Sequence, residues 1–170
     1  MDLKQSSVKR GRHKTDTTQL TRADLRKTGQ WALEEAGRIR AQHGNKPKWL
    51  ETELRYRRGG LFLIMLTSWA MRIRNAAEMQ WNRHIQLGVD GRWSFHFSGE
   101  ELKIAMRGKR KNVYQGTFSP ATSVLITEWR DHLESVYDPE ITRVVPFVFP
   151  TNDDLRAGMR KLRKERGQEE

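Results

Sequence analysis

The stretch LFLIMLTSWAMRIRNAAEMQW, residues 61–81, is the most apolar part of the chain and decides where its core lies. Up to Ser68 it is apolar on most sides, which is typical of a buried central helix. The apolar residues beyond keep the spacing of an amphipathic helix, although Arg72 and Arg74 interrupt them. Burying a guanidinium group is costly unless it is paired or faces a ligand. Arg72 therefore either extends its charge to solvent or faces an anion.

Two helices are predicted ahead of this stretch. Thr21 followed by Asp24 is typical of a helix N-terminal cap with an acidic first turn, and one apolar stripe follows it as far as Gly44. Pro47 begins a second helix, which we expect to run through two glycines into the apolar stretch. Residues 1–20 are polar and basic, so we expect a flexible basic arm there.

After the apolar stretch the pattern changes to short segments. Three of them alternate apolar and polar side chains between glycines, as short antiparallel strands do: residues 81–88, 93–99 and 112–119. Pro120 then begins another helix, residues 144–151 form a buried loop, and a basic helix follows. The fold class predicted for residues 21–170 is therefore α+β: mainly helical, with a small three-stranded antiparallel sheet.

The formal net charge of +11 is large for 170 residues and predicts a polyanionic partner, nucleic acid before membrane. Residues 1–85 carry 18 Lys and Arg against 8 Asp and Glu, whereas residues 86–170 carry 14 against 13. The absence of cysteine excludes disulfides, thiolate nucleophiles and cysteine zinc sites. The longest apolar run, residues 61–66, cannot span a membrane, and the N-terminus lacks a hydrophobic signal core. We therefore expect a cytoplasmic protein without a membrane partner.

Familiar hydrolase motifs are missing: the sequence holds no G-x-S-x-G, no H-E-x-x-H and no P-loop. Turn solvation and helix capping explain the adjacent pairs Glu100–Glu101 and Asp153–Asp154 better than a metal site does, because neighbours point to different sides of an element. The chemistry that remains is phosphate binding by an arginine on a rigid helix and a lysine on a hairpin. The histidines lack metal-ligand spacing and are expected to be surface or strand residues: His13, His43, His84, His96 and His132.

The segment SWAMRIRNAAEMQWNRHI, residues 68–85, resembles the first arginine box of the tyrosine recombinase (phage integrase) family. In that family a helix ending in a Thr-Gly-Leu-Arg-Ile-type sequence leads on to the first strand of a small sheet. On this resemblance Arg72 is the catalytic arginine. The resemblance covers residues 21–165 and implies a partial, tyrosine-recombinase-like catalytic domain.

The family also carries an active-site lysine in the turn between the second and third strands. Two lysines compete for this role: Lys103, in FSGEELK, and Lys109, in GKRKNVYQGTFS. We slightly prefer Lys103, because its Glu-Glu-Leu-Lys context suits boxes of the Arg-Ile-Arg-Asn type. Unless they bind DNA, the three arginines before the apolar stretch form a solvated basic face. The cations assigned to DNA binding are Arg55, Arg57, Arg58, Arg74, Arg107, Arg110 and Lys111.

The family completes its site with a His-x-x-Arg box, a later His or Trp and a tyrosine nucleophile, and it needs no metal or nucleotide cofactor. None of these follows in that order here, and Tyr56, Tyr114 and Tyr137 are expected to be packing residues. The resemblance thus implies a DNA recombination and integration protein of a mobile element. We expect it to bind double-stranded DNA, beside a second copy or a full-length recombinase, but not to cleave or rejoin DNA alone.

Two other functions stay open on the residues alone. A non-catalytic basic DNA-binding protein would grip phosphates with the basic N-terminal half and residues 107–111. A helical interaction module would have no role with nucleic acid. DNA affinity that falls with rising salt favours the first, and no DNA binding at low salt favours the second.

Overall fold

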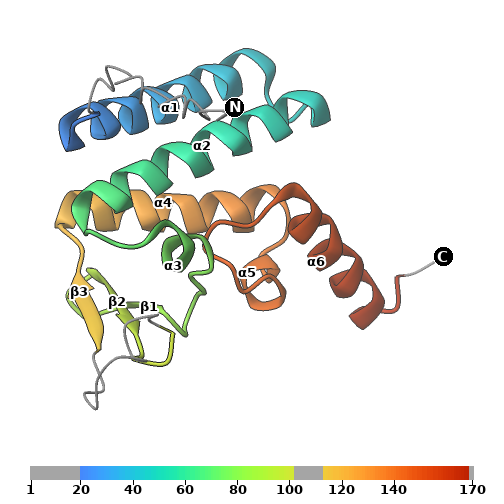
Figure 1. Cartoon of the computed structure of the whole chain (residues 1–170). Helices are drawn as coiled ribbons and strands as arrows, with labels where there is room; N and C mark the ends of the chain where they lie inside the picture. The colour runs from blue at the N-terminus through green and yellow to red at the C-terminus, as the bar shows by residue number, and fades with distance from the viewer. Residues whose placement is uncertain (1–19, 102–112, 169–170) are drawn as a thin grey trace, which may run out of the picture.

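The structure is a computed structural model that describes residues 20–101 and 113–168. In Figure 1, three long helices lie one beside the next, a small sheet lies at one end of this layer, and two further helices lie toward the other end. The predicted class, mainly helical α+β with a three-stranded antiparallel sheet, is confirmed. The elements are α1 (Arg22–His43), α2 (Pro47–Ser68), α3 (Ile73–Ala77), β1 (Ile85–Leu87), β2 (Trp93–Phe97), β3 (Tyr114–Thr117), α4 (Pro120–Val136), α5 (Ile141–Val144) and α6 (Asn152–Glu165).

Helix α1 begins at the predicted cap. The hydroxyl oxygen of Thr21 accepts a hydrogen bond from the backbone N–H of Asp24 (3.1 Å), and the Asp24 carboxylate accepts one from the Thr21 N–H (3.0 Å). Helices α1 and α2 then cross in backbone contact at Gly29 and Gly60. A Cβ on Gly60 would lie 2.7 Å from the Gly29 carbonyl oxygen, and one on Gly29 would lie 2.8 Å from the Gly60 oxygen. Only glycine at both positions permits this approach.

Helix α2 is the buried central helix that the apolar stretch predicts, but it ends at Ser68. The expectation that Arg72 lies within a helix is therefore wrong. The hydroxyls of Thr67 and Ser68 both donate to the carbonyl oxygen of Ile64, at 2.8 and 2.9 Å, and Trp69 is extended. Such side chains compete with backbone donors and favour a helix end. The most buried apolar residues of α2, each at most 1% exposed, are Leu54, Leu61, Ile64 and Met65.

The sheet has the order β1-β2-β3, and both pairs are antiparallel as predicted. Phe95, at the centre of β2, pairs with Ile85 of β1 and with Gly116 of β3. The odd-numbered residues of β2 are buried against the helices, and the even-numbered residues face away from them. Strand β1 is shorter than the predicted segment because Asn82 takes a positive φ of 61° in a turn before it.

The predicted buried loop follows α5 and ties three parts of the chain together. The carbonyl oxygen of Val148 accepts a hydrogen bond from Nε1 of Trp129 on α4 (2.7 Å). The backbone N–H of Val148 donates to the carbonyl oxygen of Met79 (2.8 Å). The N–H of Trp81 donates to the carbonyl oxygen of Pro146 (2.8 Å). The chain between α3 and β1 is thereby fixed to α4.

The glycine crossing predicts opposite effects of alanine at two neighbouring positions. Gly60→Ala should lower the free energy of unfolding by about 1 to 3 kcal/mol, because its methyl group meets the backbone of α1. Gly59→Ala is the matched control: a Cβ there has no neighbour within 4 Å. Its better helix propensity should raise the free energy of unfolding by about 0.5 to 1 kcal/mol. Urea unfolding of both variants measures this, and equal stabilities would contradict the crossing.

Candidate nucleic-acid interface

Arg72 lies between α2 and α3, as the N-terminal cap residue of α3. Its backbone is extended, with φ −68° and ψ 137°. The side chain is exposed. The cost of burying a guanidinium group, expected if Arg72 lay within a buried helix, therefore does not arise. Among the described residues it has no side-chain hydrogen-bond or ion-pair partner.

The chain that precedes Arg72 is anchored to the sheet. The Trp69 ring meets the Phe95 ring edge-on, with centroids 5.2 Å apart. Trp69 also covers Gly116 of β3, where an added Cβ would lie 2.6 Å from the indole ring. Met71 is only 8% exposed. Arg72 is thus an outward-facing cation that follows Trp69, which packs on β2 and β3, and the buried Met71.

Arg74 is exposed on α3, and its Nε donates to Oε1 of Glu78 at 2.8 Å. An ion pair this exposed contributes little stability, but its carboxylate offsets the arginine charge. Ile73, between the two arginines, is 69% exposed. This edge of the molecule therefore presents two arginines and an isoleucine to the outside, of which Arg74 has an acidic neighbour.

The three arginines of α2 do not form one solvated basic face. Arg55 is exposed. The Nε of Arg57 donates to Oε1 of the buried Glu53 (3.0 Å), and Nη1 of Arg58 donates to the carbonyl oxygen of Pro150 (2.7 Å). The solvated face is therefore wrong for Arg57 and Arg58, because helical geometry turns these two side chains toward neighbouring elements.

Part of the predicted site falls between β2 and β3, where the structure describes only the start and end of the connection. Glu101 fixes that start. Its carboxylate accepts hydrogen bonds from the N–H and hydroxyl of Ser98 (2.8 and 3.0 Å), from Arg83 (2.8 Å) and from His84 (2.8 Å). The base of the connection is thereby held to the chain before β1. The residues outside the described ranges are Lys103, Arg107, Lys109, Arg110 and Lys111.

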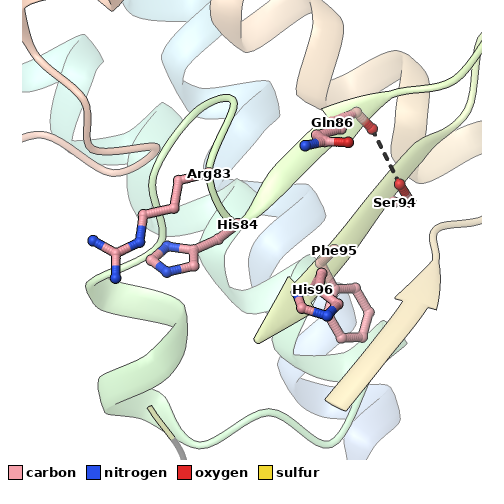
Figure 2. Close-up of a pocket in the computed structure, with 6 residues that line it drawn as sticks. All are labelled: Arg83, His84, Gln86, Ser94, Phe95 and His96. Carbon is pink, nitrogen blue, oxygen red and sulfur yellow. Dashed lines mark hydrogen bonds between the residues drawn. The ribbon is translucent and has the colours of Figure 1, made fainter. Parts of the chain in front are cut away.

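His84 is only 7% exposed, so the expectation of a surface or strand histidine is wrong for it. Its Nδ1 accepts the N–H of Gln80 (3.0 Å), which places the proton on Nε2, and Nε2 donates to Glu101. This hydrogen bond is the main reason why the pKa of Glu101 is lowered to about 2. His84 also lines a hollow of about 290 Å³, together with Arg83, Gln86, Ser94, Phe95 and His96. Figure 2 shows these six side chains.

A second buried polar group is centred on Glu53, which is 0% exposed. Its carboxylate contacts Arg40 of α1 (3.4 Å) and Arg57 (3.0 Å), and Nε2 of His132 on α4 lies 3.7 Å away. The side chain of His132 is 10% exposed, so this histidine too departs from the expected surface position. Burial, followed by the charges of Arg57 and Arg40, lowers its pKa to about 4. No local pattern signals this group, because its members come from three helices.

Within the described ranges, no group of three or more His, Cys, Asp or Glu side chains could hold a metal ion. In the same part of the chain no helix combines the length and apolarity needed to cross a bilayer. Comparison of the chain with protein-family models, curated proteins and solved structures finds no match. The resemblance to tyrosine recombinases thus depends on the arginine box and the order of the elements.

The burial of His132 predicts an acid-sensitive contribution to stability. An unfolded histidine takes up its proton near pH 6.5, whereas the folded His132 does so only near pH 4. Between these values the unfolded state binds more protons. The contribution of this residue to the free energy of unfolding therefore decreases by about 3 kcal/mol as the pH is lowered from 6.5 to 4. In His132→Gln this part of the pH dependence should disappear, and in the exposed control His96→Gln it should persist. Urea unfolding at pH 7.0 and 4.5 measures it; unchanged pH dependence in His132→Gln would contradict it.

Proposed function

We propose that this chain is a DNA-binding protein of the tyrosine recombinase type, which serves site-specific recombination or integration but does not break DNA alone. The observation that supports this most is Arg72, an exposed cation on a segment held against the sheet. The planar donor fork of arginine suits phosphate oxygens. The three strands follow Arg72 in the chain, and the connection from β2 to β3 carries the two candidate lysines, Lys103 and Lys109. This is the order that the resemblance implies.

Three of the other candidate DNA-binding arginines already have partners within the fold, which supports the role of Arg72. Arg57 and Arg58 are engaged within the fold, and Arg74 has Glu78 beside it. Arg72 has no such partner among the described residues. A cation without a partner can contact a phosphate without first breaking an ion pair. The net charge of +11 adds a general attraction for DNA.

The surroundings of the three tyrosines support DNA binding without strand cleavage. Tyr114 and Tyr137 pack against the core, and burial raises the pKa of both phenols. The Tyr56 ring meets the Trp31 ring edge-on at 5.7 Å. A phenol with a raised pKa is a poorer nucleophile at neutral pH, because less of it is ionised. All three side chains therefore serve packing in this proposal.

The Arg72 proposal predicts a local loss of DNA affinity. Arg72→Ala should weaken binding to a labelled DNA duplex about five- to tenfold and should reduce the slope of log Kd against log salt by about 1, because one phosphate contact is lost. Arg74→Ala, two residues away, removes the same charge and should have less than half of this effect. Fluorescence anisotropy at several salt concentrations measures both. Equal effects of the two variants, or no binding of the wild type at low salt, would contradict the proposal.

The proposal also predicts that no covalent intermediate forms. A nicked suicide duplex, which traps a tyrosine recombinase on its DNA, should give no protein–DNA adduct that survives denaturing electrophoresis. A full-length tyrosine recombinase on its own nicked site is the positive control. An adduct that disappears in one of Tyr56→Phe, Tyr114→Phe or Tyr137→Phe would identify a nucleophile and overturn this part of the proposal.

A further inference from the structure

Helix α6 has two different sides. Leu155 and Leu162 are each 1% exposed. Gly158 packs so closely on α5 and the residue after it that an added Cβ would lie 2.3 Å from Val145. The exposed part of the helix surface carries four cations, here called the α6 basic face: Arg160, Lys161, Arg163 and Lys164.

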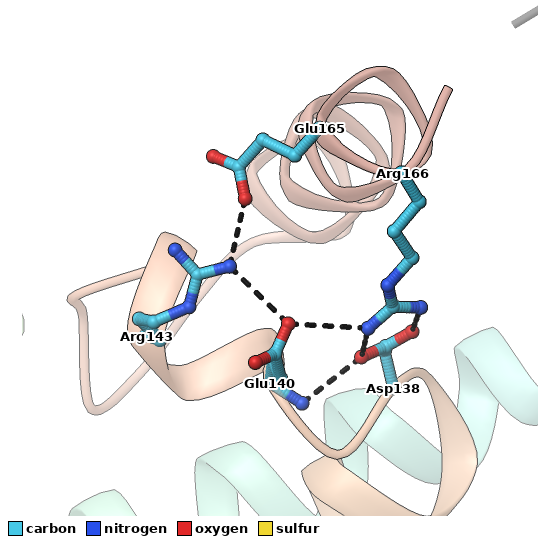
Figure 3. A network of polar contacts seen from close by, with 5 residues as sticks. All are labelled: Asp138, Glu140, Arg143, Glu165 and Arg166. Atoms are coloured by element: carbon cyan, nitrogen blue, oxygen red, sulfur yellow. Dashed lines mark hydrogen bonds and ion pairs between the residues drawn. The ribbon is translucent and has the colours of Figure 1, made fainter. Parts of the chain in front are cut away.

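A network of polar contacts fixes the C-terminal end of α6 (Figure 3). Arg166 holds the carboxylate of Asp138 with both terminal nitrogens, at 2.6 and 2.9 Å. Glu140 accepts from Arg166 and from Arg143, each at 3.2 Å, and Arg143 also binds Glu165 at 2.7 Å. These contacts set the rotation of α6, so its basic face points in one direction.

The same network engages the carboxylates near the basic face. Among the described residues, it engages Asp138, Glu140 and Glu165 with Arg143 and Arg166, neither of which belongs to the face. None of the four cations of the face has a side-chain hydrogen bond or ion pair with another described residue. They lie within five consecutive residues, so about 6 Å of helix carries four positive charges. A ligand with closely spaced negative charges would relieve the repulsion between these cations.

We propose that the α6 basic face binds the phosphate backbone of double-stranded nucleic acid, as a surface separate from Arg72. A duplex carries one negative charge per about 1.7 Å of its axis, which matches this density of cations. A lipid surface fits less well, because amphipathic helices enter membranes with an apolar side, and that side of α6 is buried in the fold. A protein partner fits less well too, because none of the large exposed apolar residues of the described chain lies on α6.

The face lies away from the Arg72 segment. In Figure 1, α6 extends from the end of the molecule opposite β3, beyond α5. The inference extends the proposed DNA binding but does not depend on Arg72.

The test is charge reversal on the face. Arg160→Glu/Lys164→Glu should weaken binding to a 30-base-pair labelled duplex at least tenfold and reduce the slope of log Kd against log salt by about 2. The control, Arg26→Glu/Lys27→Glu, makes the same change of charge at two exposed positions of α1. It should reduce the slope by less than half as much. Circular dichroism melting confirms that both variants fold.

A second measurement does not depend on charge-reversed variants. With p-benzoylphenylalanine in place of Ala157, which is exposed on α6, irradiation should crosslink the chain to the duplex. The same replacement at the exposed Ala41 of α1 is the control and should crosslink far less.

The outcomes separate the two proposals. If the α6 double variant keeps its affinity and salt slope while Arg72→Ala loses both, the α6 proposal is overturned alone. If the reverse holds, the Arg72 proposal is overturned and the α6 proposal stands. If the wild type does not bind the duplex at low salt, both are overturned. Equal crosslinking from positions 157 and 41 also overturns the α6 proposal.

Discussion

The contact of Trp69 with the sheet is the interaction on which the rest of the candidate site depends. The indole ring meets Phe95 edge-on and fills the space above Gly116, where any side chain would collide with it. This contact holds the chain in an extended conformation directly after the buried α2. Arg72 is the cap residue of the short helix that follows. Together with the burial of Met71 before Arg72 and of Ala76 after it, this contact places the arginine in a defined relation to the strands.

Buried polar groups decide which cations are available to a ligand. Glu53 has no contact with solvent and engages Arg40 and Arg57, so these arginines serve the packing of α1 on α2. Glu101 engages Arg83 and His84 at the base of the connection after β2. Removing the arginine partners of the buried Glu53 would cost several kcal/mol, which keeps Arg40 and Arg57 in place. Net charge alone therefore overstates the basic surface, and the positions of the carboxylates show where cations stay exposed.

The parts of the fold that depend on local pattern could be predicted from the sequence. The Thr21–Asp24 cap and the alternation in residues 93–99 each specify an element without reference to distant residues. The end of α2 was not predicted, because apolar spacing continues past Ser68. The hydroxyls of Thr67 and Ser68 are a local signal for this end, but the packing of Trp69 on Phe95 that follows it becomes visible only in the folded chain. The pairing of His84 with Glu101 was missed for the same reason, since only the folded chain brings them together.

The most direct test of the central claim follows the Arg72 side chain itself while DNA binds. In ¹⁵N-labelled protein, the Nε–Hε signal of Arg72 can be assigned by its loss in Arg72→Lys and followed during titration with a short duplex. The account predicts that this signal shifts and that its exchange with water slows as the guanidinium binds a phosphate, while the Arg74 signal changes less. An Arg72 signal that stays unchanged at saturating DNA would contradict the account.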